Sequence, residues 1–588
     1  MSRTLSILLF SVVYLFACIS QCIGQSNYKQ IKIVLTKPEQ RKGVLKIIND
    51  FKESNLLSDS ITLSKNFNTL QNNFYEKGYL EFSIDSLNWE DSSAAALLYI
   101  GKSYEGLVIR GSNIDDKVFN TIGINKSAYE NRSVSPSRLK KLSDNILSHF
   151  ENNGYPFAEV QLSDIQFIDS KLNADVQITK NTLVTIDSVV IKGDSKLNQN
   201  YIYSYLNLKP GDVYNESIIR RISNRIKELS FVDSEKETQV YFRNNKARVY
   251  LYLKDRSVSS VDGILGLQSD RESGKVNLTG EIKLFLSNSF SRGEKLKFHW
   301  KQPRKLTQNL EVEVNYPFLF STPFGLDAKL EIYKHDTTYL DLKQLIGVQY
   351  VFSGNNYLEA FVQYHNSTLL STSNFSSLTV LPEWADINNT NYGLRLNIEK
   401  LDYKFNPRKG WLVDLSVAVG TKKIEQNSKI SEELYDSLLL KSNQYQANLK
   451  ANYFWNVYKR HVLNFGVNSA ALLGDDIFSN QLYRIGGLKS LRGFDEESIL
   501  ATTYSILTIE YRYLLEQNAY FLLFANGAYY EAETRTGFVN DNPIGFGTGI
   551  AFETKLGIFN LNYAIGQQFN NPIFFRDAKL HFGIVNYF

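Results

Sequence analysis

Cysteine is almost absent from this sequence. Its 588 residues contain two, Cys18 and Cys22, and both stand near the amino terminus. The apolar run Leu5 to Ala17 follows a basic residue, which is typical of a secretory signal peptide and too short for a spanning helix. We expect cleavage after Gly24, which leaves a mature chain with no thiol or disulfide. Lipidation at Cys18 is the alternative, and the bulky Phe16 disfavours it.

Long hydrophobic runs, charge excess and catalytic motifs are also missing. No later segment has about twenty apolar residues in a row, so we expect no spanning helix. The formal net charge is +4, which gives no footprint for nucleic acid. The six histidines have no metal-ligand spacing and no Gly-x-Ser-x-Gly elbow is present, so we expect no enzyme, no metal and no cofactor, with an outer-membrane lipase as the catalytic alternative. Aromatic residues reach 13% instead, which favours a secreted β-rich protein or an outer-membrane barrel.

The first part of the chain repeats one pattern. A helical run with an apolar face ends at Gly78-Tyr79 before a strand, and the same arrangement recurs at Gly154-Tyr155, 76 residues later. A third apolar helical face runs from Ile218 to Leu229, and each module also opens with a strand. We therefore predict three related α+β modules of about 75 residues. Their expected bounds are 25–104, 105–181 and 182–256, after a signal peptide at 1–24.

From residue 257 to 588 the hydrophobic pattern changes to a period of two. Tyr445 to Tyr453 alternates apolar residues with Gln, Asn and Lys. One apolar and one strongly polar face suit a barrel with lipid outside and water inside, although a soluble sandwich is not excluded by this pattern. The polar stretches 381–390 and 421–437 predict extracellular loops. Three alternating glycines from Gly545 to Gly549 indicate a thin, bendable wall.

A basic, glycine-hinged stretch, 484–494, lies between these strands and ends in Leu491-Arg492-Gly493-Phe494. This ending resembles the Val/Leu-Arg-Gly-Phe/Tyr motif on the sixth extracellular loop of the BamA and TamA superfamily of outer-membrane assembly and translocation proteins. The repeated modules resemble the periplasmic POTRA domain of that family, and three copies look most like the TamA branch. The resemblance implies α+β POTRA repeats followed by an antiparallel transmembrane β-barrel of about sixteen strands.

The resemblance also implies a lock inside the barrel. The stretch Leu507 to Arg512 resembles the strand that gives the loop arginine an inward carboxylate, so we pair Arg492 with Glu510, with Gly493 and Phe494 beside them. The family has a second acid in a Phe-x-Asp-x-Gly segment, and we place Ala525 at that position, which puts a two-carboxylate lock in doubt. A further match is the turn that begins a strand, with Pro407 fixing φ and Gly410 permitting a positive φ.

The expected function is insertion or translocation of proteins at the outer membrane of a Gram-negative bacterium, with the modules in the periplasm. Its partners would be the lipid bilayer, unfolded outer-membrane or secreted clients, and an inner-membrane-anchored or periplasmic accessory protein, but no nucleic acid. We expect the barrel to open between its first and last strands. Competing hypotheses are a two-partner-type secretion translocator and a surface-antigen barrel that transports nothing. The predicted seam residues are Gly263, Gly266, Phe582, Ile584 and Phe588.

Overall fold

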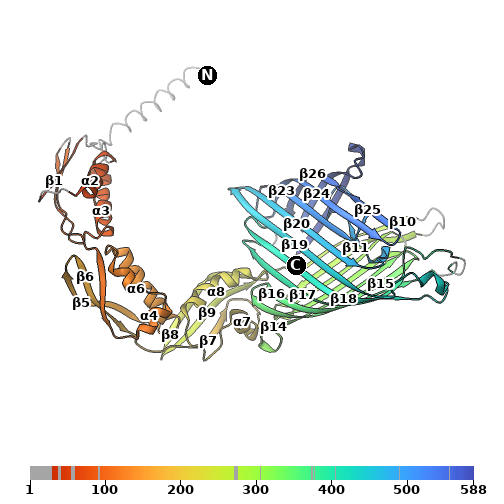
Figure 1. Ribbon diagram of the computed structural model, residues 1–588, viewed down its shortest axis with the longest axis horizontal. Coiled ribbons are helices and arrows are strands. Elements are labelled where there is room, and N and C mark those ends of the chain that lie inside the picture. Colours follow the sequence, from red (N-terminus) through yellow and green to blue (C-terminus); the bar gives the residue numbers. More distant parts are fainter. Residues whose placement is uncertain are drawn as a thin grey trace, which may run out of the picture. The chain divides into compact units, whose positions relative to one another are not determined.

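The computed structural model divides the chain into two compact units, residues 1–185 with 213–217, and residues 186–212 with 218–588 (Figure 1). Each unit is described by itself. Residues 30–587 are described here, except for 38–40, 55–59, 91–92, 270–275, 305, 372–374, 376–377, 404–405, 489 and 555–556. The expected signal peptide and Phe588 therefore lie outside the described residues.

The first unit contains two modules, each with a three-stranded sheet. Their strand orders are β1-β3-β2 and β4-β6-β5, and in both sheets the central strand runs parallel to the first strand and antiparallel to the third. The first module contains β1 (Gln30–Leu35), α2 (Lys42–Ser54), α3 (Ser60–Glu76), β2 (Ser83–Glu90) and β3 (Ser93–Tyr99). The second contains β4 (Gly106–Ser112), α4 (Asp116–Thr121), α5 (Ser127–Glu130), α6 (Pro136–Glu151), β5 (Glu159–Ile168) and β6 (Lys171–Thr179).

Local sequence signals account for the long helices of these modules. Helix α6 begins where the Ser135 side chain accepts a hydrogen bond from the Arg138 backbone N–H, and Pro136 occupies its first turn. Gly78 and Gly154 follow α3 and α6 with φ angles of 91° and 93°, which residues with a side chain rarely adopt. The two glycines therefore end their helices at equivalent places, as the repeat predicts.

The second unit begins with a third sheet of the same strand order, β7-β9-β8. It is formed by β7 (Thr185–Lys192), β8 (Val232–Arg243) and β9 (Lys246–Asp255), with α7 (Gln199–Leu206) and α8 (Glu216–Glu228) between its first two strands. Helix α7 packs against the following barrel, since the Tyr201 ring lies 5.6 Å from that of Phe318 in the turn after β13. The last module and the barrel thus share an aromatic contact.

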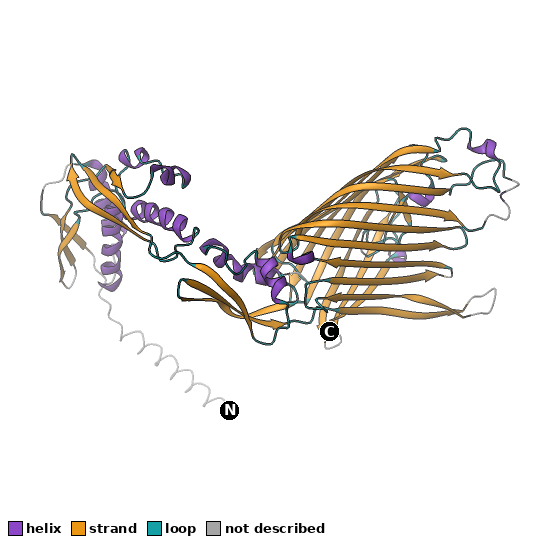
Figure 2. Cartoon of the chain, turned by 90° about the horizontal axis from the view of Figure 1, so that it is seen from below, coloured by secondary structure: helices purple, strands orange, loops and turns teal. Residues whose placement is uncertain are grey.

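The rest of the second unit is a closed antiparallel barrel (Figures 1 and 2). Strand β24 pairs with β25 through Tyr530–Thr534 and with β26 through Tyr520–Gly527, so β25 and β26 together occupy one position in the wall. Counted in this way the barrel has sixteen strands, as predicted. The strands that precede the loop containing residues 484–494 are β10 (Ser260–Ser269), β11 (Val276–Ser287), β12 (Lys295–Arg304), β13 (Thr307–Tyr316), β14 (Phe324–His335), β15 (Tyr339–Ser353), β16 (Asn356–Leu369), β17 (Asp386–Leu401), β18 (Gly410–Glu425), β19 (Lys441–Tyr458) and β20 (His461–Gly474). Those after it are β23 (Thr503–Leu514), β24 (Tyr520–Thr534), β25 (Gly537–Asp541), β26 (Ile544–Thr554), β27 (Gly557–Gln567) and β28 (Lys579–Tyr587).

The barrel wall has two chemically different faces. On β23 the side chains of Leu507 and Ile509 are exposed on the outside, whereas Glu510 is buried inside. The apolar outer face and polar inner face agree with the predicted alternation. Within the described part of the chain, no helix has the length and apolar character needed to cross a membrane.

The two stretches predicted as loops are partly strand. Strand β17 begins at Asp386 and β18 continues to Glu425, so both extend into the polar stretches at 381–390 and 421–437. Ile387 and Ile424 at these strand ends belong to a buried apolar cluster with residues of the connecting loops. The prediction was wrong here because polar residues that face inward in a barrel look the same in sequence as polar residues of a loop.

Candidate functional site

A segment that connects β20 to β23 enters the barrel and presents Arg492 to the wall. It contains the short hairpin β21 (Tyr483–Ile485) and β22 (Ile499–Ala501), with the motif between them. The Arg492 Nη1 donates to Glu510 Oε2 on β23 at 2.8 Å, and its Nε donates to Asn526 Oδ1 on β24 at 3.2 Å. Its guanidinium carbon also lies 3.6 Å from the Phe524 ring centroid. The structure thus brings the predicted pair together.

The lock contains a second arginine that the sequence analysis did not single out. Arg512, two residues along β23, donates from Nε to Glu510 Oε1 at 2.6 Å, so each carboxylate oxygen accepts from a different guanidinium. The residues Arg492 and Glu510 are only 9% and 6% exposed. Breaking a buried ion pair leaves one charge without compensation, which is strongly destabilising. We therefore infer that this site depends on all three side chains.

The predicted position of the missing second acid was wrong by one residue. Ala525 is exposed on the outer face of β24, whereas Asn526 is buried on the inner face and accepts the hydrogen bond from Arg492. Asn526 also donates from Nδ2 to Thr508 Oγ1 at 2.6 Å. Because neighbouring residues of a strand face opposite sides, a one-residue shift moved the position from lumen to outside. A neutral amide therefore contacts Arg492 from β24.

Glycines of the motif and of the wall that faces it allow the two to lie close together. Gly493 has a φ of 99°, and a side chain there would clash with the backbone of Ile565 on β27. A side chain at Gly545 on β26 would meet the Arg492 carbonyl oxygen, and one at Gly566 on β27 would meet the Phe494 ring. Gly545, the first of the alternating glycines, and Gly566 therefore allow the loop backbone to approach the wall closely, a role that the spacing of the alternating glycines did not indicate.

The turn with Pro407 and Gly410 is connected to the same lock. Gly410 has a φ of 121°, and the Asp402 backbone N–H donates to the Lys409 carbonyl at 3.1 Å across the turn. Asn406, just before Pro407, accepts from Arg512 Nη1 at 3.0 Å. This contact gives the turn a second role, because it also orients the arginine that pairs with Glu510.

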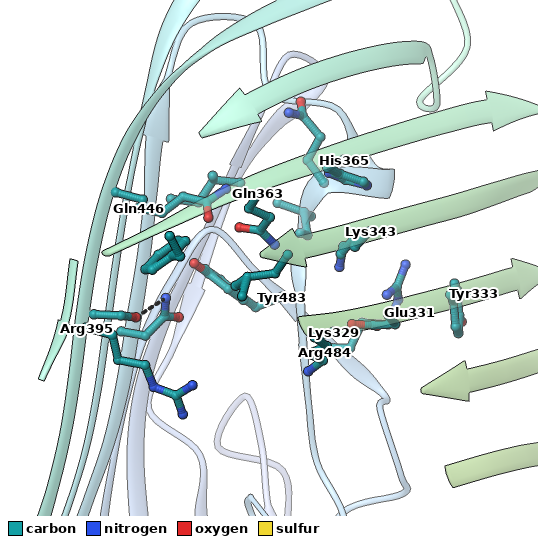
Figure 3. Close-up of a pocket in the computed structure, with 18 of the residues that line it drawn as sticks. Lys329, Glu331, Tyr333, Lys343, Gln363, His365, Arg395, Gln446, Tyr483 and Arg484 are labelled. Carbon is teal, nitrogen blue, oxygen red and sulfur yellow. Dashed lines mark hydrogen bonds between the residues drawn. The ribbon is translucent and has the colours of Figure 1, made fainter. Parts of the chain in front are cut away.

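The lumen segment is also held by the opposite wall. Arg484 on β21 donates from Nη2 to Tyr339 Oη at 2.7 Å and lies 3.7 Å from Asp341 Oδ2. Its guanidinium carbon is 4.0 Å from the ring centroid of Tyr333 on β14. Figure 3 shows Arg484 and Tyr483 beside a polar cavity of about 520 Å³. The segment therefore contacts two separate parts of the barrel wall.

Acidic residues that follow the motif form ion pairs with β28, the last strand of the barrel, and with β12, the third strand. Asp495 Oδ1 lies 2.7 Å from Lys579 Nζ on β28, and Glu497 Oε1 lies 3.1 Å from Lys301 Nζ on β12. These side chains are partly exposed, so each ion pair contributes little stability alone. Together they connect the last strand of the barrel to the third through the lumen segment.

The barrel closes through a short joint between its first and last strands. Among the described residues, strands β10 and β28 pair at two positions, Ser260 with Tyr587 and Val261 with Asn586. By contrast, β10 pairs with β11 at ten positions and β28 with β27 at seven. We call the β10–β28 joint the seam.

The predicted seam residues lie beside this joint rather than in its paired part. Gly263 and Gly266 pair with Ile282 and Thr279 on β11. Phe582 and Ile584 pair with Leu561 and Phe559 on β27. The seam contacts predicted for Phe588 cannot be placed, since that residue lies outside the described part.

Among the described residues, no group of three or more histidine, cysteine, aspartate or glutamate side chains is arranged to hold a metal ion.

Comparison with known proteins agrees with this architecture. Residues 278–588 match the Omp85 superfamily domain, and residues 184–254 match the POTRA domain described as a surface antigen variable number repeat. The chain belongs to the Omp85 superfamily. No curated protein matches the sequence.

Two solved structures have the same fold. CdiB from Escherichia coli is 14% identical with a TM-score of 0.54, over 82% of this chain and 90% of that chain. CdiB from Acinetobacter baumannii is 12% identical with a TM-score of 0.51, over 94% of this chain and 100% of that chain. These likenesses show the fold alone. The recognition of POTRA modules followed by an Omp85 barrel is therefore confirmed.

Proposed function

We propose that this protein is a non-enzymatic insertase of the outer membrane of a Gram-negative bacterium. The modules, with bounds near 25–104, 105–181 and 182–256, lie in the periplasm and receive unfolded clients. The barrel then inserts these clients into the bilayer through the seam. The observation that carries the proposal is that, within the described part of the two strands, β10 pairs with β28 at only two positions.

The short seam supports lateral opening for an energetic reason. In lipid every backbone N–H and C=O group must be paired within the protein, so a barrel wall resists opening in proportion to the ladder that is broken. Among the described strands, the seam has the fewest paired positions, so opening it would break the fewest backbone hydrogen bonds. Opening would expose the edges of β10 and β28, and an unpaired edge can template the first strand of a client.

The lumen segment supports a lateral route rather than passage through the barrel. Arg492 and Arg484 hold this segment against two parts of the wall, so it obstructs the interior. A client that leaves through the seam does not need the segment to move out. Passage through the lumen would require the buried Arg492–Glu510 pair to break, which is costly.

The modules offer edges for extended client chains. Strand β5 is the outer strand of its sheet, with a register shift between Ser163 and Gln166. It exposes the side chains of Ile165, Phe167 and Ile168. Unpaired backbone groups beside apolar side chains suit capture of an extended peptide by β-augmentation. An accessory protein of the periplasm or inner membrane would use similar edges.

A reconstitution experiment tests the proposal. The purified protein is placed in liposomes, an unfolded outer-membrane barrel protein is added, and its insertion is measured by protease protection and heat-modifiable mobility. We expect faster insertion than in empty liposomes. Equal rates would contradict the insertase. Delivery of a soluble polypeptide to the other side of the membrane would instead support a two-partner-type translocator. If neither insertion nor delivery is observed, the surface-antigen barrel is the hypothesis that remains.

A further inference from the structure

The connection between β27 and β28 is unusually apolar for an exposed loop. Its most exposed large apolar residues are Phe575 at 77% and Phe569 at 53%, followed by Phe574 and Ile573. Leu580, the second residue of the next strand, is 68% exposed. We call residues Phe569–Phe575 the aromatic flap. Large apolar side chains that remain exposed together in a small segment mark an interaction site.

The flap lies against the outer wall of the barrel. Tyr563, on the outer face of β27, donates from its hydroxyl to the Phe575 carbonyl at 3.3 Å. Tyr563 and Leu580 are opposite each other in the β27–β28 pairing, and both are exposed outward. The apolar surface of the flap is therefore continuous with the outer surface of the wall, which faces lipid if the barrel is in the membrane as proposed above.

Hydrogen bonds hold the flap in this position. The Phe569 backbone N–H donates to Asp541 Oδ2 on β25 at 2.7 Å, and Gln568 Nε2 donates to Tyr530 Oη on β24 at 2.9 Å. At the other end, the Arg576 guanidinium carbon lies 5.0 Å from the Phe574 ring centroid. A cation beside aromatic rings is the pairing found where proteins meet the polar edge of a bilayer. The flap is thus fixed by specific hydrogen bonds, and its apolar side chains are exposed on the outside of the barrel.

We propose that the aromatic flap inserts into the outer leaflet of the membrane beside the seam. Its occupant is lipid, because its apolar surface continues the lipid-facing wall and its cation suits the anionic headgroup region. The flap is followed at once by β28, one of the two strands of the seam. Side chains wedged among lipids at this point would loosen their packing where the client enters. This inference rests on the proposed membrane location of the barrel but not on insertase activity.

Fluorescence quenching with single cysteines tests the proposal. In a full-length protein without Cys18 and Cys22, Phe575→Cys is labelled with an environment-sensitive fluorophore and reconstituted in liposomes that contain lipid-borne quenchers. Leu394→Cys on the outer wall of β17, 52% exposed, is the control for lipid contact. Leu439→Cys in the β18–β19 loop, 57% exposed, is the control for water. Ile573→Cys provides a second reporter if the first variant does not fold.

We expect the flap label to be quenched by lipid-borne quenchers, as at Leu394, and protected from aqueous iodide. Quenching by iodide, as at Leu439, would overturn the proposal, since the flap would then lie in water. Protection from both quenchers would also overturn it, because protein would cover the flap. These outcomes are separate from the insertion assay. If the Leu394 label is not quenched by lipid, the membrane location itself is wrong.

Discussion

Two joints of the barrel wall differ strongly in their backbone pairing. Strands β17 and β18 pair at sixteen positions, whereas β10 and β28 pair at two. If the barrel lies in lipid as proposed, opening the β17–β18 joint would leave many backbone groups without hydrogen bonds, whereas opening the seam would leave few. The difference identifies the seam as the joint with the fewest paired positions among the described strands, and the proposed opening there would require the remaining wall to be braced. We propose that the Arg492 lock supplies this brace, through its contacts with β23 and β24.

Arg492→Ala should have the largest effect, because it leaves the buried Glu510 with one cation fewer and releases the loop. Removing one partner of a buried ion pair costs about 3–5 kcal/mol. We expect a large loss of folded barrel in the membrane, measured by heat-modifiable mobility and urea unfolding in lipid vesicles. Arg492→Lys keeps the charge but not the fork and should be intermediate. Normal levels and full activity of Arg492→Ala would remove the lock from the account.

Gly545→Val should have the next largest effect. The added side chain would meet the Arg492 carbonyl oxygen and push the loop from its seat on the wall. Overpacking of this kind costs about 1–3 kcal/mol. Urea unfolding should show the loss. The matched control is Gly527→Ala on β24, where an added methyl group meets nothing within 4 Å. Equal stability of the two variants would mean that the loop does not depend on this close approach.

Asn526→Asp should strengthen the brace. Two guanidinium groups share the single carboxylate of Glu510, so a second carboxylate would make the existing hydrogen bond from Arg492 charge-assisted, and the Thr508 hydroxyl can donate to it. We expect a gain of about 1 kcal/mol in the free energy of unfolding. Ala525→Asp, on the outer face of the same strand, should instead destabilise the barrel. If Ala525→Asp were more stable than Asn526→Asp, the second acid would belong at position 525, as the sequence analysis predicted.

Lys301→Gln should have the smallest effect on stability, below about 1 kcal/mol, because the pair with Glu497 is partly exposed. It should nevertheless make the seam open more often, since the acidic segment would no longer connect β12 with β28. The measurement is the rate of cysteine labelling at Val261→Cys, with Leu394→Cys as the control on the long joint. An unchanged labelling rate would show that these ion pairs do not hold the seam.

The sequence predicted much of the barrel and of the lock, but not their details. Alternation predicted the wall, and the motif together with Leu507 to Arg512 predicted the pairing of Arg492 with Glu510. The second acid position was misassigned because a shift of one residue in a strand exchanges lumen for outside. Arg512 was missed because its orientation depends on Asn406, which lies in a turn more than a hundred residues away in the sequence.

The number of paired positions in the seam also could not come from the sequence. Gly263 and Gly266 suggested a weak edge, yet both lie beyond the two positions that pair with β28. Pairing length depends on how the closed barrel brings its ends together, which no local pattern records. The aromatic flap shows the same limit, since its sequence reveals apolar residues but not the outer wall against which they lie.

Reversible cross-linking of the seam tests the central claim most directly. Val261→Cys/Asn586→Cys places a cysteine pair across the seam, and Leu394→Cys/Val417→Cys places one across the long joint, at directly paired positions in both cases. Client insertion in liposomes is measured before oxidation, after oxidation and after reduction. The account predicts that oxidation stops insertion only in the seam variant and that reduction restores it. Undiminished insertion with the seam fully cross-linked would contradict lateral opening.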